Sequence, residues 1–309
     1  MRILITGSTG MIGSRLVERL STKHTIVEFS RKKGLDITRS MDCEKALKNI
    51  DAVIHAAAEL DEMKTHDEMW NVNVTGTKNL LEAAEKNDVR QFIFLSSVGV
   101  YGETKQKLHE KSEMNPLTNY EKSKKAAEEL VWNMQEVFPV TIIRPALVLG
   151  PNFYWAQIFK IVKKGFPLIG KGENAWQMID VDDLTNFIVS CVGNEDTYNE
   201  EFIVAEKENH TLKEVVNMIA DLVHVKQPGT IPKTVGMMAG YLFLAQGKIF
   251  GKKTLLIPAH VKRLFKHREY DVSKALKTGW KPHYTTRSAL EKTFKELDEN
   301  GMLTSRKNN

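Results

Sequence analysis

The apolar positions of this chain fall into two alternating patterns. Short, mostly continuous apolar runs are separated by stretches in which apolar residues recur every three or four positions, as Ile12, Leu16, Val17 and Leu20 do in the first of them. Continuous runs predict buried strands, and the wider spacing predicts amphipathic helices. The expected strands are Ile3–Ile5, His24–Ser30, Ala52–Ala57, Gln91–Ser97 and Val140–Val148, and the expected later helices are Met41–Lys48, Val72–Lys86 and Tyr120–Val137.

This alternation indicates an α/β fold. Strands separated by helical segments form βαβ units, and successive units build a Rossmann-type doubly wound parallel sheet. We expect residues 1–150 to form this sheet domain and residues 176–205 to return to it. Residues 151–175 and 206–309 are then expected to form a smaller C-terminal lobe.

Three glycines follow the first strand at the point where the first helix begins. Gly7, Gly10 and Gly13 lie between the apolar run Ile3–Ile5 and the helical pattern that starts at Ile12. Glycine lets backbone N–H groups approach a pyrophosphate closely, and the positive end of the helix dipole adds attraction for the same group. The strand, glycine turn and helix therefore predict a dinucleotide-binding site.

The alternation weakens after Gly150. A strand at Glu201–Ala205 and a helix at Leu212–His224 return later, and an apolar, methionine-rich helix is expected at Val235–Phe250. This helix is too short and too interrupted to span a membrane. We favour a lobe helix that covers a substrate pocket; the alternative is an interfacial helix in weak contact with a membrane surface, with Lys248, Lys252 and Lys253 at its end.

Composition and charge narrow the class of protein. Hydrophobic residues make up 42% and charged residues 27% of the 309 residues, which is ordinary for a soluble globular chain. The two cysteines, Cys43 and Cys191, cannot build a disulfide framework, and no leader is expected before the first strand, so we expect a reducing, cytoplasmic setting. Residues 226–309 hold 17 Lys/Arg and 6 Asp/Glu, a net charge of +11. We expect this basic third to be a solvated surface and no nucleic-acid partner, because no nucleic-acid-binding motif accompanies it.

Candidate catalytic side chains follow the later strands. Tyr120 and Lys124 are four residues apart and therefore share one face of a helix. A neighbouring ammonium group favours the phenolate and is expected to lower the pKa of Tyr120, which prepares it for proton transfer. Ser96 and Ser97 end an apolar strand where a doubly wound sheet places its ligand crevice, and a hydroxyl there can stabilise charge on a substrate oxygen.

At this point the chain resembles the extended short-chain dehydrogenase/reductase family of NAD(P)-dependent epimerases, dehydratases and reductases. The resemblance covers nearly the whole chain. It rests on Thr6–Gly13, Val53–Ala58, Asn73–Thr77, Leu95–Gly102, Tyr120-x-x-x-Lys124, Arg144-Pro145 and Val181–Asp183.

The resemblance implies a role for each matching residue. Tyr120 would be the proton donor and acceptor, and Lys124 would hold the ribose and lower the pKa of the tyrosine. Ser97 rather than Ser96 would supply the catalytic hydroxyl. Asn73 would be the structural and proton-relay asparagine. The implied cofactor-binding residues are Gly7, Thr9, Gly10, Met11, Ile12, Gly13, Ser30, Arg31, Asp36, Ile37, Ala56, Ala57, Ala58, Tyr120, Lys124, Pro145 and Ala146. No metal is expected. Family members often dimerise through the helices expected at Val72–Lys86 and Tyr120–Val137, so a homodimer is a further expectation.

The end of the second strand favours NADP over NAD. NAD enzymes of this type place a carboxylate there to bond the ribose 2′-OH. The equivalent residue here is Ser30, followed by Arg31, Lys32 and Lys33, and Arg31 can pair with a 2′-phosphate. Glu28 lies two residues earlier and is expected to be deeper in the fold.

Three functions fit these residues. The favoured one is an NADP-dependent reductase or dehydrogenase for a partly apolar small molecule, resembling the 3β-hydroxysteroid dehydrogenase and dihydroflavonol reductase branch, because Val235–Ile257 suits an apolar pocket. The alternative is a nucleotide-sugar epimerase or dehydratase. Such enzymes usually carry a diphosphate-binding arginine where Trp176 stands, and Lys262, Arg263 or Arg268 could replace it. The third is a non-catalytic cofactor sensor, a class that often lacks the Tyr/Lys pair.

Overall fold

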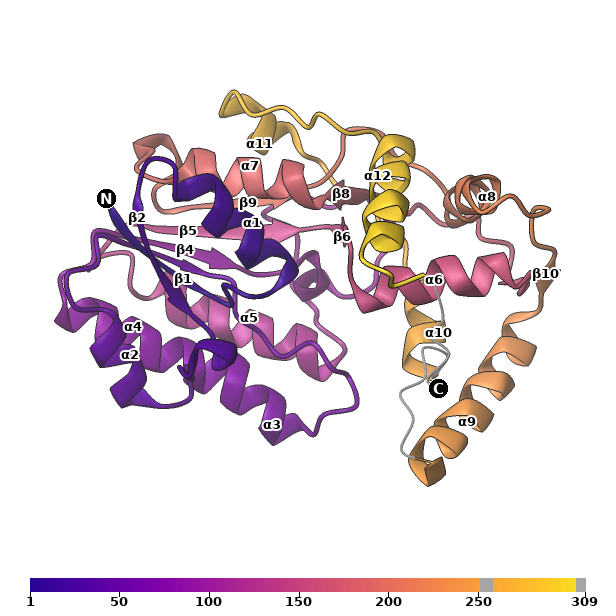
Figure 1. Cartoon of the computed structure of the whole chain (residues 1–309), viewed down its shortest axis with the longest axis horizontal. Coiled ribbons are helices and arrows are strands. Elements are labelled where there is room, and N and C mark those ends of the chain that lie inside the picture. The colour runs from indigo at the N-terminus through magenta and orange to yellow at the C-terminus, as the bar shows by residue number, and fades with distance from the viewer. Residues whose placement is uncertain (251–257, 304–309) are drawn as a thin grey trace.

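The computed structural model describes residues 1–250 and 258–303, and its centre is a sheet of six parallel strands (Figure 1). The strand order is β2-β1-β3-β4-β5-β9, which confirms the expected doubly wound sheet. The strands are β1 (Arg2–Thr6), β2 (Thr25–Phe29), β3 (Ala52–His55), β4 (Gln91–Leu95), β5 (Val140–Pro145) and β9 (Glu200–Val204). β3 and β4 are buried along their whole length, as expected for strands covered on both faces.

Helices cover both faces of the sheet. Because successive side chains of a strand point to opposite faces, Ile3 and Ile5 of β1 join one core cluster, and Leu4 joins the other. Figure 1 shows α1 (Met11–Leu20) and α7 (Val181–Cys191) on one face, and α2 (Ser40–Ala46), α4 (Gly76–Lys86) and α5 (Asn119–Trp132) on the other. The chain passes from β1 to β2 on one side and then crosses to β3 on the other. Ligands of doubly wound sheets bind at the carboxyl ends of strands at such a reversal.

Several elements differ from the expected ranges. The strand expected at Val140–Val148 divides into β5, which ends at Pro145, and β6 (Leu147–Leu149), which pairs with β8 (Met178–Asp180). The helix expected at Val72–Lys86 is a π-helical turn at Asn71–Thr75 followed by α4. The short helix α3 (His66–Trp70), fixed by a capping box, was not expected.

The smaller lobe is a cluster of helices beside the sheet domain. Its core lies between α6 (Phe153–Lys163), α8 (Leu212–Leu222) and α12 (Thr286–Glu299), of which α12 was not expected. β7 (Leu168–Ile169) pairs with β10 (Thr230–Ile231) at the lobe's edge. The remaining helices are α9 (Lys233–Phe250), α10 (Pro258–Leu264) and α11 (Ser273–Lys277).

The apolar segment expected at Val235–Ile257 lies partly within the described residues. Its helix, α9, begins two residues earlier than expected. Residues 251–257, with Lys252 and Lys253, lie outside the described residues. Among the described residues, none of the helices combines the length and apolar character needed to cross a bilayer.

Candidate functional site

The glycine turn packs against the end of β3 with no room for side chains. Gly7 has φ +66°, and a Cβ atom there would lie 2.9 Å from the backbone nitrogen of Ala57. A Cβ atom on Gly13 would lie 2.1 Å from the carbonyl oxygen of Gly7. No side chain caps the N-terminus of α1 at Gly10. The turn therefore leaves backbone N–H groups and a positive helix end for an anion.

A cleft of about 780 Å³ opens at the carboxyl ends of β1, β2 and β3. The predicted cofactor-binding residues in its walls are Gly7, Thr9, Gly10, Met11, Ile12, Gly13, Ser30, Arg31, Asp36, Ile37, Ala56, Ala57 and Ala58. Pro145 and Ala146 lie at the end of β5, outside this lining. Three lobe residues in the lining were not predicted: Asn152, Phe153 and Tyr154. Asn152 accepts the backbone N–H of Trp155 at 3.0 Å and so caps α6, which is the signal that could have placed it.

The end of β2 fits the adenosine half of a dinucleotide. The Ser30 hydroxyl is buried and has no hydrogen-bond partner in the described part of the chain. The Arg31 side chain is 68% exposed, and its guanidinium group lies 4.0 Å from the carboxylate of Glu59. Together with the glycine turn, the unpaired Ser30 hydroxyl and the exposed Arg31 cation in the cleft wall fit an NAD(P) cofactor.

Ser97 lies near the carboxyl end of β4, close enough to Tyr120 for its hydroxyl to lower the pKa of the phenol. Tyr120 lies in the first turn of α5, whose start is fixed by a capping box between Thr118 and Glu121. Ser96 does not take part, because its buried hydroxyl has no partner among the described residues. The structure thus brings the predicted tyrosine together with Ser97, the serine chosen from the sequence.

The pKa of Tyr120 lies above its ordinary value, whereas the sequence predicted a value below it. Burial raises this pKa to about 12, and the Arg263 charge and the Ser97 hydrogen bond oppose the rise. Lys124 directs its ammonium group elsewhere: Nζ donates a hydrogen bond of 2.5 Å to the carbonyl oxygen of Leu95. Burial lowers the pKa of Lys124 to about 7. The cation that favours the phenolate is therefore Arg263, a residue that sequence reasoning did not connect with Tyr120.

Asn73 joins the cleft wall to the helix that carries Tyr120. Its amide oxygen accepts the backbone N–H of Glu59 at 2.7 Å, and its amide nitrogen donates to the Ser123 hydroxyl at 2.9 Å. Ser123 in turn donates to the carbonyl oxygen of Tyr120 at 2.8 Å. Asn73 lies in the π-helical turn Asn71–Thr75, a form that is frequent at functional sites. These bonds give Asn73 a positioning role.

A buried chain of hydrogen bonds behind the cleft was not predicted. Thr77 donates its hydroxyl proton to the carbonyl oxygen of Asn73 at 2.6 Å, so His55 must donate from Nε2 to Thr77 at 2.9 Å. Nδ1 of His55 then accepts from Thr6 at 2.7 Å, and Thr6 accepts the backbone N–H of Ala57 at 3.1 Å. Burial lowers the pKa of His55 to about 3, which keeps the ring neutral. The presence of a histidine inside the apolar run Val53–Ala58 is the sequence feature from which this buried chain of hydrogen bonds could have been predicted.

Two arginines of the lobe lie near the tyrosine and the cleft. The Arg268 guanidinium group lies 5.0 Å from the ring centre of the buried Trp176, and no described carboxylate forms an ion pair with it. Arg268 interacts electrostatically with Tyr154, a cleft residue. Arg263 of α10 lies 3.8 Å from the carboxylate of Glu62, also in the cleft wall. These guanidinium groups can receive an anionic substrate group.

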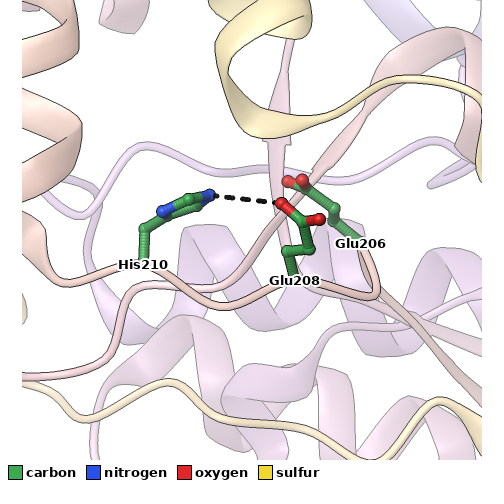
Figure 2. Close-up of side chains that lie close together, drawn as sticks. All are labelled: Glu206, Glu208 and His210. Carbon is green, nitrogen blue, oxygen red and sulfur yellow. Dashed lines mark ion pairs between the residues drawn. The ribbon is translucent and has the colours of Figure 1, made fainter.

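One group of described residues has ligand atoms close enough to hold a metal ion (Figure 2). Glu206, Glu208 and His210 offer atoms within 4.8 Å of one another, on the loop after β9. Both carboxylate oxygens of Glu206, however, accept hydrogen bonds from Thr286, one from its backbone N–H at 2.6 Å and one from its hydroxyl. The Glu206 carboxylate therefore connects the loop to α12, and we do not propose a metal site at this cluster.

Comparison with known proteins gives a consistent result. The family model described as NAD dependent epimerase/dehydratase family matches residues 3–205. The chain is 30% identical to the N-acetyl-alpha-D-glucosaminyl-diphospho-ditrans,octacis-undecaprenol 4-epimerase of Escherichia coli O157:H7, with 94% of each chain covered. It is 32% identical to the UDP-glucose 4-epimerase of Vibrio cholerae, again with 94% of each covered.

A solved structure is similar in fold. The UDP-glucuronic acid 4-epimerase from Bacillus cereus, in complex with NAD, superimposes with a TM-score of 0.78 at 21% identity. The match covers 97% of this chain and 99% of that chain, so it includes the lobe as well as the sheet domain.

Proposed function

Because the chain belongs to the NAD dependent epimerase/dehydratase family, we propose that it is a 4-epimerase for a sugar carried on a diphosphate. The observation that carries this proposal is the closeness of Ser97 to Tyr120, which lies in the first turn of α5, with the Arg263 charge acting on the phenol. Tyr120 can exchange a proton with a sugar hydroxyl, and the arginines can pair with a diphosphate. Both relatives named above are 4-epimerases, and both of their names contain a sugar diphosphate.

The site residues divide the proposed chemistry between them. A bound nicotinamide ring supplies a hydride acceptor that also returns the hydride, so the cycle has no net oxidation. Tyr120 accepts the proton of the C4 hydroxyl as that carbon becomes a ketone, and returns it when the carbonyl is reduced on the opposite face. Ser97 donates a hydrogen bond to the same oxygen. Burial raises the pKa of Tyr120 to about 12 although the charge of Arg263 favours the phenolate, and the positive charge of an oxidised nicotinamide ring would favour the phenolate further.

The described part of the apolar segment gives no support to a reductase of apolar substrates. Helix α9 contributes none of the described residues that line the cleft, and residues 251–257 lie outside the described residues. In addition, Arg268 supplies a cation beside Trp176, where the sequence had lacked one. The diphospho-sugar alternative is therefore better supported than the reductase.

For the cofactor we propose a preference for NADP over NAD. The unpartnered hydroxyl of Ser30 stands where NAD enzymes place a carboxylate. Glu28, the nearest carboxylate along β2, lies 3.2 Å from Lys33 and is neutralised there. The exposed Arg31 can pair with a 2′-phosphate.

The direct test is the stereochemistry of the product. The purified protein is incubated with UDP-glucose, with UDP-N-acetylglucosamine and with a polyprenyl-diphosphate-linked N-acetylglucosamine, and the C4 configuration is read by NMR. We expect a 4-epimer from at least one of them, without accumulation of reduced cofactor. Tyr120→Phe should lower kcat by about 10²–10⁴-fold. Tyr198→Phe, a control that lies just before β9 at the opposite, amino edge of the sheet, should not. One-way formation of reduced cofactor without a 4-epimer would instead support the reductase.

A further inference from the structure

Helix α9 has two apolar sides, and only one of them is covered. A Cβ atom on the buried Gly236 would lie 2.3 Å from Cγ2 of Ile169, so this side packs against β7. The exposed side, here named the α9 stripe, consists of Val235, Met238, Tyr241 and Leu242. Met238 is 67% and Leu242 66% exposed. Their spacing of three and four residues places them along one line of the helix.

The formal charges that flank the stripe along the sequence are all of one sign, and two of these cations, Arg263 and Lys266, are paired with Glu62 and Glu121. No residue from Thr234 to Gly247 is charged, and no Asp or Glu occurs between residues 222 and 268. The same 222–268 segment contains nine basic residues: Lys226, Lys233, Lys248, Lys252, Lys253, Lys262, Arg263, Lys266 and Arg268.

This pattern of charge favours one kind of binding partner for the α9 stripe. An uncharged apolar stripe inside a purely basic segment complements a bilayer that contains anionic lipid. A second copy of the chain would bring an equally basic segment to a symmetric interface, and the like charges would repel. Because the described helices include none that can span a bilayer, the expected arrangement is a helix lying in the interface.

The stripe is linked to the cleft through α10. Figure 1 shows α9 at the end of the lobe, extending away from the sheet, with α10 beside it. α10 packs on α9, and its Arg263 approaches Glu62 of the cleft wall. Three cleft residues in this region are large, apolar and exposed: Leu60, Met63 and Phe153. An apolar chain attached to a diphosphate in the cleft would therefore meet apolar side chains on its way out.

We propose that α9 docks the protein on an anionic phospholipid bilayer through the α9 stripe. The substrate of the cleft is then a diphospho-sugar whose lipid tail stays in that bilayer. This second statement rests on the proposed epimerase function, whereas the docking does not.

The docking is tested without any substrate. The full chain is floated with vesicles of phosphatidylcholine alone and with vesicles in which about one third of the lipid is phosphatidylglycerol. We expect binding to the anionic vesicles that weakens as salt is raised. Replacing both Met238 and Leu242 with serine should weaken it roughly tenfold or more, because both side chains lose their apolar burial. The matched control replaces Met41 and Val137, exposed apolar residues on the sheet domain, and should bind like the wild type.

Two results would overturn the docking. One is a wild type that does not float, or a Met238→Ser/Leu242→Ser variant that floats equally well. The other is a wild-type dimer that this variant converts to monomers while no vesicle binding is seen, since the stripe would then be an interface between copies.

Whether the substrate is linked to a lipid is tested by a separate measurement of activity. With the polyprenyl-linked sugar embedded in anionic vesicles, the double variant should lose activity in proportion to its lost binding. With a water-soluble UDP-sugar it should match the wild type. Equal activity of variant and wild type on the embedded substrate would contradict the lipid-linked substrate. Inactivity of the wild type on every sugar would contradict only the epimerase, because flotation is measured independently.

Discussion

The guanidinium group of Arg268 lies over the ring of Trp176, 5.0 Å from its centre, and the backbones of the two residues form a parallel β-bridge. The family resemblance led us to expect a diphosphate-binding arginine where Trp176 stands. The bridge places the cation of Arg268, from a distant part of the chain, beside this tryptophan. The stack and the backbone hydrogen bond from Arg268 to Ala175, 2.8 Å long, hold that cation in position.

Replacing Arg268 tests whether this cation binds the diphosphate. Arg268→Ala should raise KM for the diphospho-sugar by roughly 10–100-fold, the range expected for a lost charge-assisted hydrogen bond, with a smaller change in kcat. Arg287→Ala, which removes an exposed arginine paired with Glu291 on α12, is the matched control and should leave KM unchanged. An unchanged KM in Arg268→Ala would show that the diphosphate binds elsewhere.

Arg31 should decide the cofactor preference. Arg31→Ala should raise KM for NADP by about tenfold and leave KM for NAD nearly unchanged, because only NADP carries the 2′-phosphate. Steady-state kinetics with both cofactors on the wild type and the variant measure this. Lys32→Ala, the neighbouring basic residue in the cleft wall, serves as the comparison. A wild type that prefers NAD would refute the proposed preference.

The sheet domain could be predicted because its signals are local. Apolar runs, helical spacing and the glycine turn each occupy a short window, and each reports one strand, helix or turn. The glycine turn follows from the same signals, because it adjoins the end of the first strand. The other cofactor-binding residues, Tyr120 as the proton carrier and the choice of Ser97 over Ser96 came from the family resemblance, because Asp36, Ile37 and Tyr120 do not adjoin a strand end.

The remaining parts of the site depend on contacts between distant segments. Arg268 lies about ninety residues from Trp176 in the sequence, and Arg263 approaches Tyr120 from the lobe. No short stretch of sequence therefore predicts either contact. The place of α9 depends on tertiary contacts in the same way: a run of apolar residues indicates that a helix prefers apolar contacts, but not whether those contacts come from the protein's own cleft.

His55 should make the folded state sensitive to mild acid. The pKa of His55 is lowered by burial from 6.5 to about 3, so between these values the unfolded chain binds one more proton than the folded chain. Stability therefore falls as the pH falls from about 6.5 towards 3, and this residue should contribute a loss of roughly 2 kcal/mol between pH 7 and pH 5.

Urea denaturation of the wild type and His55→Gln at both pH values measures this effect. The variant loses the buried hydrogen bonds to Thr6 and Thr77 and should be less stable than the wild type at pH 7. At pH 5 the difference in the free energy of unfolding between the two proteins should be smaller by roughly 2 kcal/mol. His109→Gln, at an exposed histidine, should follow the wild type at both values. If the difference in the free energy of unfolding between the wild type and His55→Gln is the same at both pH values, His55 takes up a proton in the folded state.

The glycine turn can be tested for close packing independently of activity. A Cβ atom on Gly13 would lie 2.1 Å from the carbonyl oxygen of Gly7, and this neighbour is backbone that cannot rotate away. Gly13→Ala should therefore shift the turn, cost about 1–3 kcal/mol in the free energy of unfolding and weaken dinucleotide binding. Gly229→Ala is the matched control, because its Cβ atom would meet nothing within 4 Å. Denaturant unfolding and calorimetric titration with NADP and NAD measure both effects, and a Gly13→Ala protein as stable as Gly229→Ala, with unchanged affinity, would contradict the packing described for this turn.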